Sequence, residues 1–176
     1  SGLAVVDEQG HLRPRFRNRV VFPILDHRGR TVGFGARLIE SRDNAPKYIN
    51  TEETALFNKR RLLYGLDKAK NAIRQKNRVL VMEGYMDVIV AHQFGFDEAV
   101  GSMGTALTAE HAQALKQLTN TVYLAMDSDA AGQQSVQRSY EVLRHLGFQI
   151  YVLAMPEKDP ADVLLQQGPE FFKQCL

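Results

Sequence analysis

The sequence is poor in cysteine and tryptophan and has no long apolar run. Among its 176 residues there is one cysteine, Cys175, and no tryptophan. A lone cysteine excludes an internal disulfide and a cysteine-based zinc cluster, and it fits a reducing compartment. No run of about 18 apolar residues occurs, which excludes a membrane-spanning helix, and the first residues lack the basic-then-apolar pattern of a secretion signal. We therefore expect a soluble, globular protein located in the cytoplasm.

The formal net charge of +2 hides an asymmetry along the chain. Residues 1–78 hold 17 lysines and arginines against 8 acidic residues, whereas residues 79–176 hold 5 against 12. Such a separation indicates a polyanionic partner for the basic half. The alternative is two solvated surfaces of opposite sign that attract each other.

The first half of the chain has the pattern of a small β-rich region. The apolar run 20–25 and the run 31–39 flank a polar stretch with a turn-forming glycine, which predicts a hairpin. Residues 40–58 are polar, and we expect them to be irregular. Residues 60–75 have apolar positions near helical spacing and predict a helix.

From residue 78 onward, strands alternate with helices, and this order predicts a parallel sheet with helices on both faces. Because hydrophobic residues make up 44%, the chain can bury the core that such a domain needs. We expect an α/β fold, with a β-rich basic part at 1–77 and the parallel-sheet domain at 78–176. The predicted strands are 79–82, 98–102, 121–126 and 148–154. The predicted helices are 87–94, 108–118 and 130–146, and residues 159–167 are expected to form a last helix or a turn.

Acidic residues follow three of the four predicted strands. Glu83 follows the first strand, Asp127 and Asp129 follow the third, and Asp159 and Asp162 follow the fourth. Ligands in open α/β sheets bind beyond the carboxyl ends of the strands, so these side chains should converge. Each acid alone is typical of a turn or of a helix cap. Three acidic strand ends on one edge favour a site for a hard divalent cation, because converging carboxylates repel each other without one.

The order of these acids resembles the Toprim fold. The matching segments are 83–87, with Glu83 followed by Gly84 and a second acid at Asp87, then 127–132, then 159–160. That fold is shared by bacterial primases, type IA and type II topoisomerases, OLD-type nucleases and some recombination proteins.

Three upstream segments narrow the resemblance to bacterial replicative primases. Residues 17–24, 46–50 and 57–66 are similar to three blocks of the primase catalytic core. With the acidic segments they extend the resemblance over roughly residues 15–172, and several blocks in a fixed order are more specific than one acidic motif.

The resemblance implies a set of site residues and a cofactor. The cofactor is Mg²⁺, with Mn²⁺ as a substitute. Glu83, Asp127 and Asp129 would be catalytic and would bind the metal, with Asp87 and Asp159 in support. Three basic residues would contact triphosphate or nucleic acid: Arg37, Lys47 and Lys59. Many primases have an acid directly after the proline of the last block, whereas here Ala161 stands before Asp162.

The resemblance also implies a reaction and its partners. A primase condenses ribonucleoside triphosphates into a short RNA primer on a single-stranded DNA template, in the cytoplasm at the nucleoid. The replicative helicase would be a partner through a domain that usually follows the core. Neither that domain nor the zinc-binding module that usually precedes the core is recognisable here, so the sequence looks like a fragment of a longer protein.

Two alternatives stay open at this point. A topoisomerase or nuclease module of the Toprim type shares the acids but cuts DNA. A receiver-type phospho-acceptor domain also carries acids after its first and third strands, and Lys158 lies near the position of its essential lysine. Receivers, however, lack a basic N-terminal half and carry paired acids after the first strand, where Glu83 stands alone.

Overall fold

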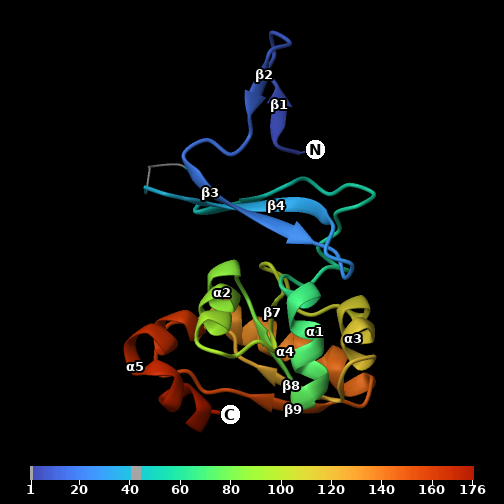
Figure 1. The fold of residues 1–176 in the computed structure, drawn as a ribbon, viewed down its shortest axis with the longest axis vertical. Helices are drawn as coiled ribbons and strands as arrows, with labels where there is room; N and C mark the ends of the chain where they lie inside the picture. Colours follow the sequence, from blue (N-terminus) through green and yellow to red (C-terminus); the bar gives the residue numbers. More distant parts are fainter. Residues whose placement is uncertain (1, 41–44) are drawn as a thin grey trace. The chain divides into compact units, whose positions relative to one another are not determined.

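A computed structural model describes residues 2–40 and 45–176 (Figure 1). The chain divides into two compact units, Ser1–Asn58 and Lys59–Leu176, and each is described by itself. Within the described residues, no helix is long and apolar enough to cross a membrane.

The first unit is made of antiparallel strands. β1 (Ala4–Val6) pairs with β2 (Leu12–Pro14), and a second sheet has the order β3-β4-β5. β3 (Arg19–Leu25) and β4 (Thr31–Leu38) form the predicted hairpin, which is thereby confirmed. β5 (Tyr48–Asn50) pairs with β4, so the prediction of an irregular stretch is wrong at these three residues.

A small apolar core holds the first unit together. Phe22, Ile24 and Phe57 are buried, and Phe57 packs over Gly33 of β4. A Cβ atom at Gly33 would lie 2.7 Å from the Phe57 ring, closer than real Cβ contacts come. The absence of a side chain at Gly33 therefore leaves room for the Phe57 ring.

The second unit contains a four-stranded parallel sheet in the order β7-β6-β8-β9. This confirms the predicted α/β fold with a parallel sheet, because each expected strand is present. The strands are β6 (Val79–Met82), β7 (Ala99–Gly101), β8 (Thr121–Leu124) and β9 (Gln149–Val152). The helices are α1 (Leu66–Lys76), α2 (Tyr85–Gln93), α3 (Ala109–Lys116), α4 (Ala130–His145) and α5 (Pro160–Gln174).

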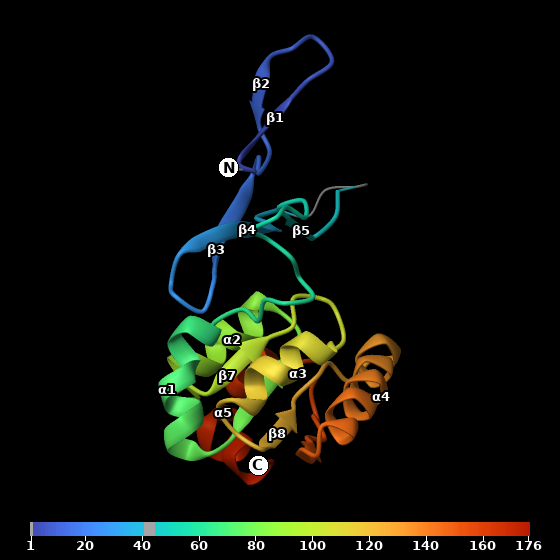
Figure 2. The same ribbon diagram turned by 90° about the vertical axis from the view of Figure 1, so that its right-hand side faces the viewer.

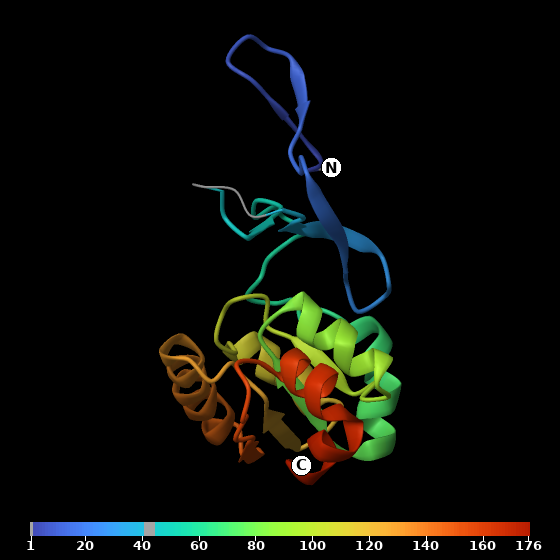
Figure 3. The ribbon, with the colours of Figure 1, turned by 90° about the vertical axis from the view of Figure 1, so that its left-hand side faces the viewer.

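Helices cover both faces of this sheet. One apolar cluster joins α1, α3 and α4 to side chains such as Val79, Val81 and Val122. The other joins α2 and α5 to Leu80 and Met82, which alternate with the first set along β6. In Figure 2, α1 and α3 lie in front of the sheet, and in Figure 3, from the opposite side, α5 does. All four residues of β6 are buried, which explains its continuous apolar sequence.

Helix α1 begins later than the apolar spacing predicts. The expected start is residue 60, but the helix starts at Leu66. Tyr64 exchanges two backbone hydrogen bonds with Gly101 of β7, and Gly65 has a φ of 79°. Since a residue bonded to a strand in this way cannot also continue a helix, the first turn is displaced.

A buried acid just before β7 forms ion pairs with a lysine at the end of α1 and an arginine just before β6. Glu98 is fully buried, and it accepts hydrogen bonds from Lys76 (2.6 Å) and Arg78 (3.0 Å). Glu98→Gln should lower the free energy of unfolding by about 2 kcal/mol, because it leaves two cations facing an uncharged group. The partly exposed cations can regain water, which keeps the loss below that of a fully buried pair.

Urea unfolding of the Glu98→Gln variant measures this loss. Glu170→Gln is the matched control, since Glu170 pairs with Lys173 at the surface (2.7 Å), and it should change stability by less than about 0.5 kcal/mol. Equal losses in both variants would show that burial of Glu98 adds nothing.

Candidate functional site

The strand order places the predicted acids at a switch point of the sheet. β6 and β8 are neighbours, and the chain leaves β6 toward β7 on one side and β8 toward β9 on the other. Ligand sites in open parallel sheets form where the connections diverge in this way. Glu83 directly follows β6, and Asp127 follows the end of β8. The Asp127 backbone N–H donates to Oε1 of Glu83 (3.4 Å), so the structure brings these two residues together.

The Asp127 carboxyl is the most perturbed group at this edge. Burial, and after it the negative charges of neighbouring acids (Glu83 first, then Asp87, Asp159 and Asp129), together raise its pKa to about 7. Its Oδ1 atom is buried and has no hydrogen-bond partner among the described residues. Burial likewise raises the pKa of Glu83. The charges of the other four predicted acids therefore all act on Asp127.

Three of these acids also cap helices. Asp129 accepts a hydrogen bond from the Gly132 N–H at the start of α4 (2.9 Å), and Asp159 caps α5 in the same way through Asp162 (2.8 Å). Asp87 accepts one from Gly84 at the start of α2 (3.0 Å). A carboxylate that caps a helix uses one oxygen and leaves the other available. Capping therefore does not prevent these acids from also contributing to the acidic edge.

Gly132 keeps the acids close to the start of α4. A Cβ atom there would collide with the backbone carbonyl of Asp127 and would lie 3.0 Å from Oε1 of Glu83. Any side chain at this position would therefore push the end of β8 away from Glu83. The glycine belongs to the site by its lack of a side chain.

The donor set fits a hard divalent cation that is only partly bound by protein. Across the described residues, no group of three or more His, Cys, Asp or Glu side chains is arranged to hold one ion. The oxygens of Glu83 and the unpartnered Oδ1 of Asp127 are nevertheless ligands of the type that Mg²⁺ prefers. Mg²⁺ commonly uses one or two carboxylates and completes its shell with water and phosphate oxygens.

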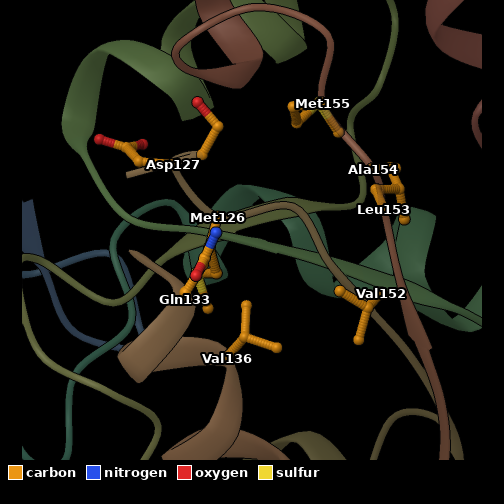
Figure 4. A pocket seen from close by; sticks show the side chains of 9 residues that line it. Met126, Asp127, Gln133, Val136, Val152, Leu153, Ala154 and Met155 are labelled. Carbon is orange, nitrogen blue, oxygen red and sulfur yellow. The ribbon is translucent and has the colours of Figure 1, made fainter. Parts of the chain in front are cut away.

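A pocket of about 300 Å³ lies beside Asp127 (Figure 4). Its wall is mainly apolar and comes from the ends of β8 and β9 and the start of α4, including Val136, Val152 and Met155. Gln133 and Ser128 are further polar members of the wall. The pocket therefore extends the acidic edge with an apolar surface.

The three predicted basic residues do not share one unit. Arg37 on β4 and Lys47 are exposed in the first unit, where the Lys47 ammonium lies 5.7 Å from the centre of the Tyr48 ring. Lys59 is half-buried and is the first residue of the second unit.

Most of the excess of positive over negative charge in residues 1–78 lies in one segment of the second unit. Residues 59–78, here called the basic segment, hold 8 lysines and arginines and one acid, Asp67, whereas residues 1–58 hold 9 against 7. The charge asymmetry seen in the sequence is therefore mainly a property of α1 and the residues just before it.

Sequence reasoning missed a histidine that contacts the basic segment. His111 on α3 is fully buried, and its Nδ1 accepts a hydrogen bond from the Thr108 N–H (3.3 Å). Its Nε2 therefore carries the proton and donates to the Lys59 carbonyl (2.8 Å). The Thr108 hydroxyl donates to the next carbonyl, that of Arg60 (2.6 Å). Only the Thr108 cap could be predicted from the sequence.

The stability of the fold should depend on pH through His111. Burial lowers the pKa of its imidazole from the usual 6.5, although the carbonyls of Lys59 and Leu62 oppose this. As the pH falls below 6.5, the unfolded chain takes up the proton first, so the stability that His111 contributes is present above this pH and is lost below it. Relative to His111→Gln, the wild-type melting temperature should fall by about 2–4 °C between pH 7.5 and 5.5.

Thermal melts of both proteins at each pH measure this difference. Substitution of Gln113, which is exposed on α3, by Ala is the control; it removes no titratable group and should leave the pH dependence unchanged. Parallel curves for wild type and His111→Gln would contradict the prediction.

Comparisons with known proteins agree with this geometry. Residues 1–70 match the family described as the N-terminal domain of the DNA primase catalytic core, and residues 80–164 match the Toprim-like family. The DNA primase of Deinococcus radiodurans is 49% identical over 171 residues, which are 96% of this chain and 30% of that protein. The chain belongs to the bacterial DNA primase family. The Escherichia coli DNA primase is 42% identical over 98% of this chain and 30% of its own length.

Solved primase structures share the fold. The zinc-binding and RNA polymerase domains of the Aquifex aeolicus primase match with a TM-score of 0.91 at 34% identity, over 98% of this chain and 43% of that one. A DnaG primase catalytic domain bound to single-stranded DNA matches with a TM-score of 0.89 at 40% identity, over 99% of this chain and 57% of that one. The Toprim resemblance is confirmed, while the boundary at residues 77 and 78 stays a prediction. The chain spans about 30% of the length of the relatives it matches.

Proposed function

We propose that this chain is the metal-dependent part of a primase that joins ribonucleoside triphosphates into RNA primers on single-stranded DNA. One observation carries the proposal: on a chain of the primase family, Glu83 and Asp127 meet at the switch point of the sheet, and a buried carboxylate oxygen there has no hydrogen-bond partner in the part of the chain that the structure describes. Membership of this family favours the activity of a primase over that of a topoisomerase, a nuclease or a receiver. We place this activity in the cytoplasm at the nucleoid, with the replicative helicase as a partner of the longer protein.

The acidic residues would divide the work of holding the cation. Glu83 and Asp127 would bind Mg²⁺, or Mn²⁺ in its place, through their carboxylate oxygens. Asp129 is not arranged with them to hold an ion in this structure and would turn its second oxygen toward the cation on binding, while Asp87 and Asp159 would keep the local charge negative and fix the starts of α2 and α5.

The reaction would be attack of a 3′-hydroxyl on the α-phosphate of the incoming ribonucleoside triphosphate, with pyrophosphate as the leaving group. When bound, the cation supplies charge neutralisation at the phosphates and lowers the pKa of the attacking hydroxyl. Arg37, Lys47 and Lys59 would contact the triphosphate or the template through charge-assisted hydrogen bonds. Such phosphate contacts are independent of sequence and sensitive to salt.

RNA synthesis on an oligonucleotide template tests the proposal. The protein that contains this chain is incubated with single-stranded DNA, the four ribonucleoside triphosphates and Mg²⁺ or Mn²⁺, and the labelled products are separated by size. Short RNA products that require both template and cation are expected. Strand cleavage without RNA synthesis would favour the nuclease alternative, and a stable aspartyl phosphate formed from acetyl phosphate would favour a receiver.

A further inference from the structure

The N terminus of α3 holds the first residues of the basic segment by two consecutive backbone carbonyls. The His111 ring donates to the Lys59 carbonyl, and the Thr108 hydroxyl donates to the Arg60 carbonyl. Both donors are fixed by α3 itself, since the Thr108 N–H donates to the ring and the His111 N–H donates to the Thr108 hydroxyl (3.2 Å). The sequence separation of about 50 residues makes this a tertiary attachment.

The charges of the same segment act on an acid of the same helix. Glu110 lies in the first turn of α3. The pKa of its carboxyl is lowered, first by hydrogen bonds at the helix start and further by the positive charges of Arg60 and Arg61. Arg60 and Arg61 are exposed, so their guanidinium groups lie at the surface close to α3. The two backbone hydrogen bonds therefore hold this part of the chain against α3, and the charges of Arg60 and Arg61 act on Glu110 from the surface.

We propose that His111 is a positioning residue that, with Thr108, fixes the backbone of Lys59 and Arg60, so that the basic side chains there meet nucleic-acid phosphates from set points. This rests on the proposed function, because it takes Lys59 as a phosphate contact. Full burial of His111 means that the ring does not touch the ligand and acts only through the backbone it holds. If the backbone of one residue must become ordered when the ligand binds, the lost conformational entropy lowers the affinity on the order of tenfold.

Two amide substitutions separate the hydrogen bonds of the ring. His111→Gln puts an N–H donor near the place of Nε2 and should keep the bond to the Lys59 carbonyl. His111→Asn reaches only the place of Nδ1 and should keep the bond from Thr108 while losing Lys59. A helix-capping role alone predicts that Asn is the better replacement, and the positioning role predicts Gln.

Binding of a fluorescent oligothymidylate to the 176-residue chain gives the readout, together with trypsin cleavage after residues 59–61. We expect affinity within about twofold of wild type for His111→Gln, and about tenfold weaker binding with faster cleavage for His111→Asn. Lys59→Gln should also weaken binding. If Lys59→Gln binds less and His111→Asn binds like wild type, the positioning role is wrong. If Lys59→Gln has no effect, the assignment of Lys59 as a contact fails and takes the positioning role with it.

A wild-type measurement decides the matter if His111→Asn does not fold. In NMR titrations with the oligothymidylate, the Nε2–H resonance of His111 should shift together with the amides of residues 59–61. A titration that shifts those amides and leaves the ring proton unchanged would overturn the proposal.

Discussion

Replacing Asp127 and Asp129 together by asparagine should lower the affinity for Mn²⁺ at least about 100-fold and abolish primer synthesis in the longer protein. Changing residues that only support ligands already costs about 10–100-fold in metal affinity, and this variant changes the ligands themselves. The physical basis is the buried Oδ1 of Asp127, which has no hydrogen-bond partner within residues 2–40 and 45–176, in a residue whose backbone N–H meets Glu83. Asparagine preserves the shape of both side chains, so the loss reports charge.

Calorimetric titration of the 176-residue chain with Mn²⁺ measures the affinity. Asp97→Asn is the control, because Asp97 is exposed in the loop before β7, at the opposite end of the sheet. The double variant should melt at the same or a slightly higher temperature in the absence of metal, since it removes repulsion among the acids. An unchanged Mn²⁺ affinity in the folded double variant would contradict the assignment of the metal site.

The convergence of Glu83 and Asp127 could be predicted from the sequence because it follows from chain order. Alternating strands and helices imply a parallel sheet, whose carboxyl ends share one edge, so acids after 79–82 and 121–126 had to converge. The structure confirms this through the contact between Asp127 and Glu83. The observed strands end within a few residues of the predicted ends, so the acids still follow the strands at the predicted edge of the sheet.

Features that depend on tertiary contacts could not be predicted. β5 and the β1–β2 hairpin involve strands of three residues, too short to show a period. The start of α1 is decided by the bond of Tyr64 to Gly101, far along the chain. His111 has the same origin, because nothing around residue 111 indicates that its ring meets a carbonyl at Lys59. The sequence also could not show that Asp129 caps a helix while it joins the acidic edge.

Neutralising Arg37, Lys47 and Lys59 to glutamine should weaken the binding of single-stranded DNA and flatten its salt dependence. Each phosphate contact releases condensed cations, so the slope of the logarithm of affinity against the logarithm of salt should shrink by about 0.7 per contact, or about 2 for three. Mn²⁺ affinity should be retained, since the acids contribute the metal ligands. The balanced charge of residues 1–58 makes the outcome informative, because a general field effect would arise mainly from the basic segment.

Affinities for an oligothymidylate at four or more salt concentrations decide this, with a control that removes the same charge elsewhere. Arg138, Arg144 and Lys173 are exposed in the acidic part of the chain, and their replacement by glutamine lowers the net charge by the same three units. If only net charge matters, both triple variants lose affinity equally. If the three basic residues are phosphate contacts, only their replacement changes the slope, because a lost contact releases fewer ions whereas a distant charge changes only the field. Wild type and the variant at Arg37, Lys47 and Lys59 could instead show identical affinities and slopes. These residues would then form a solvated surface, and the template would be held elsewhere. The rest of the basic segment would be the next surface to test.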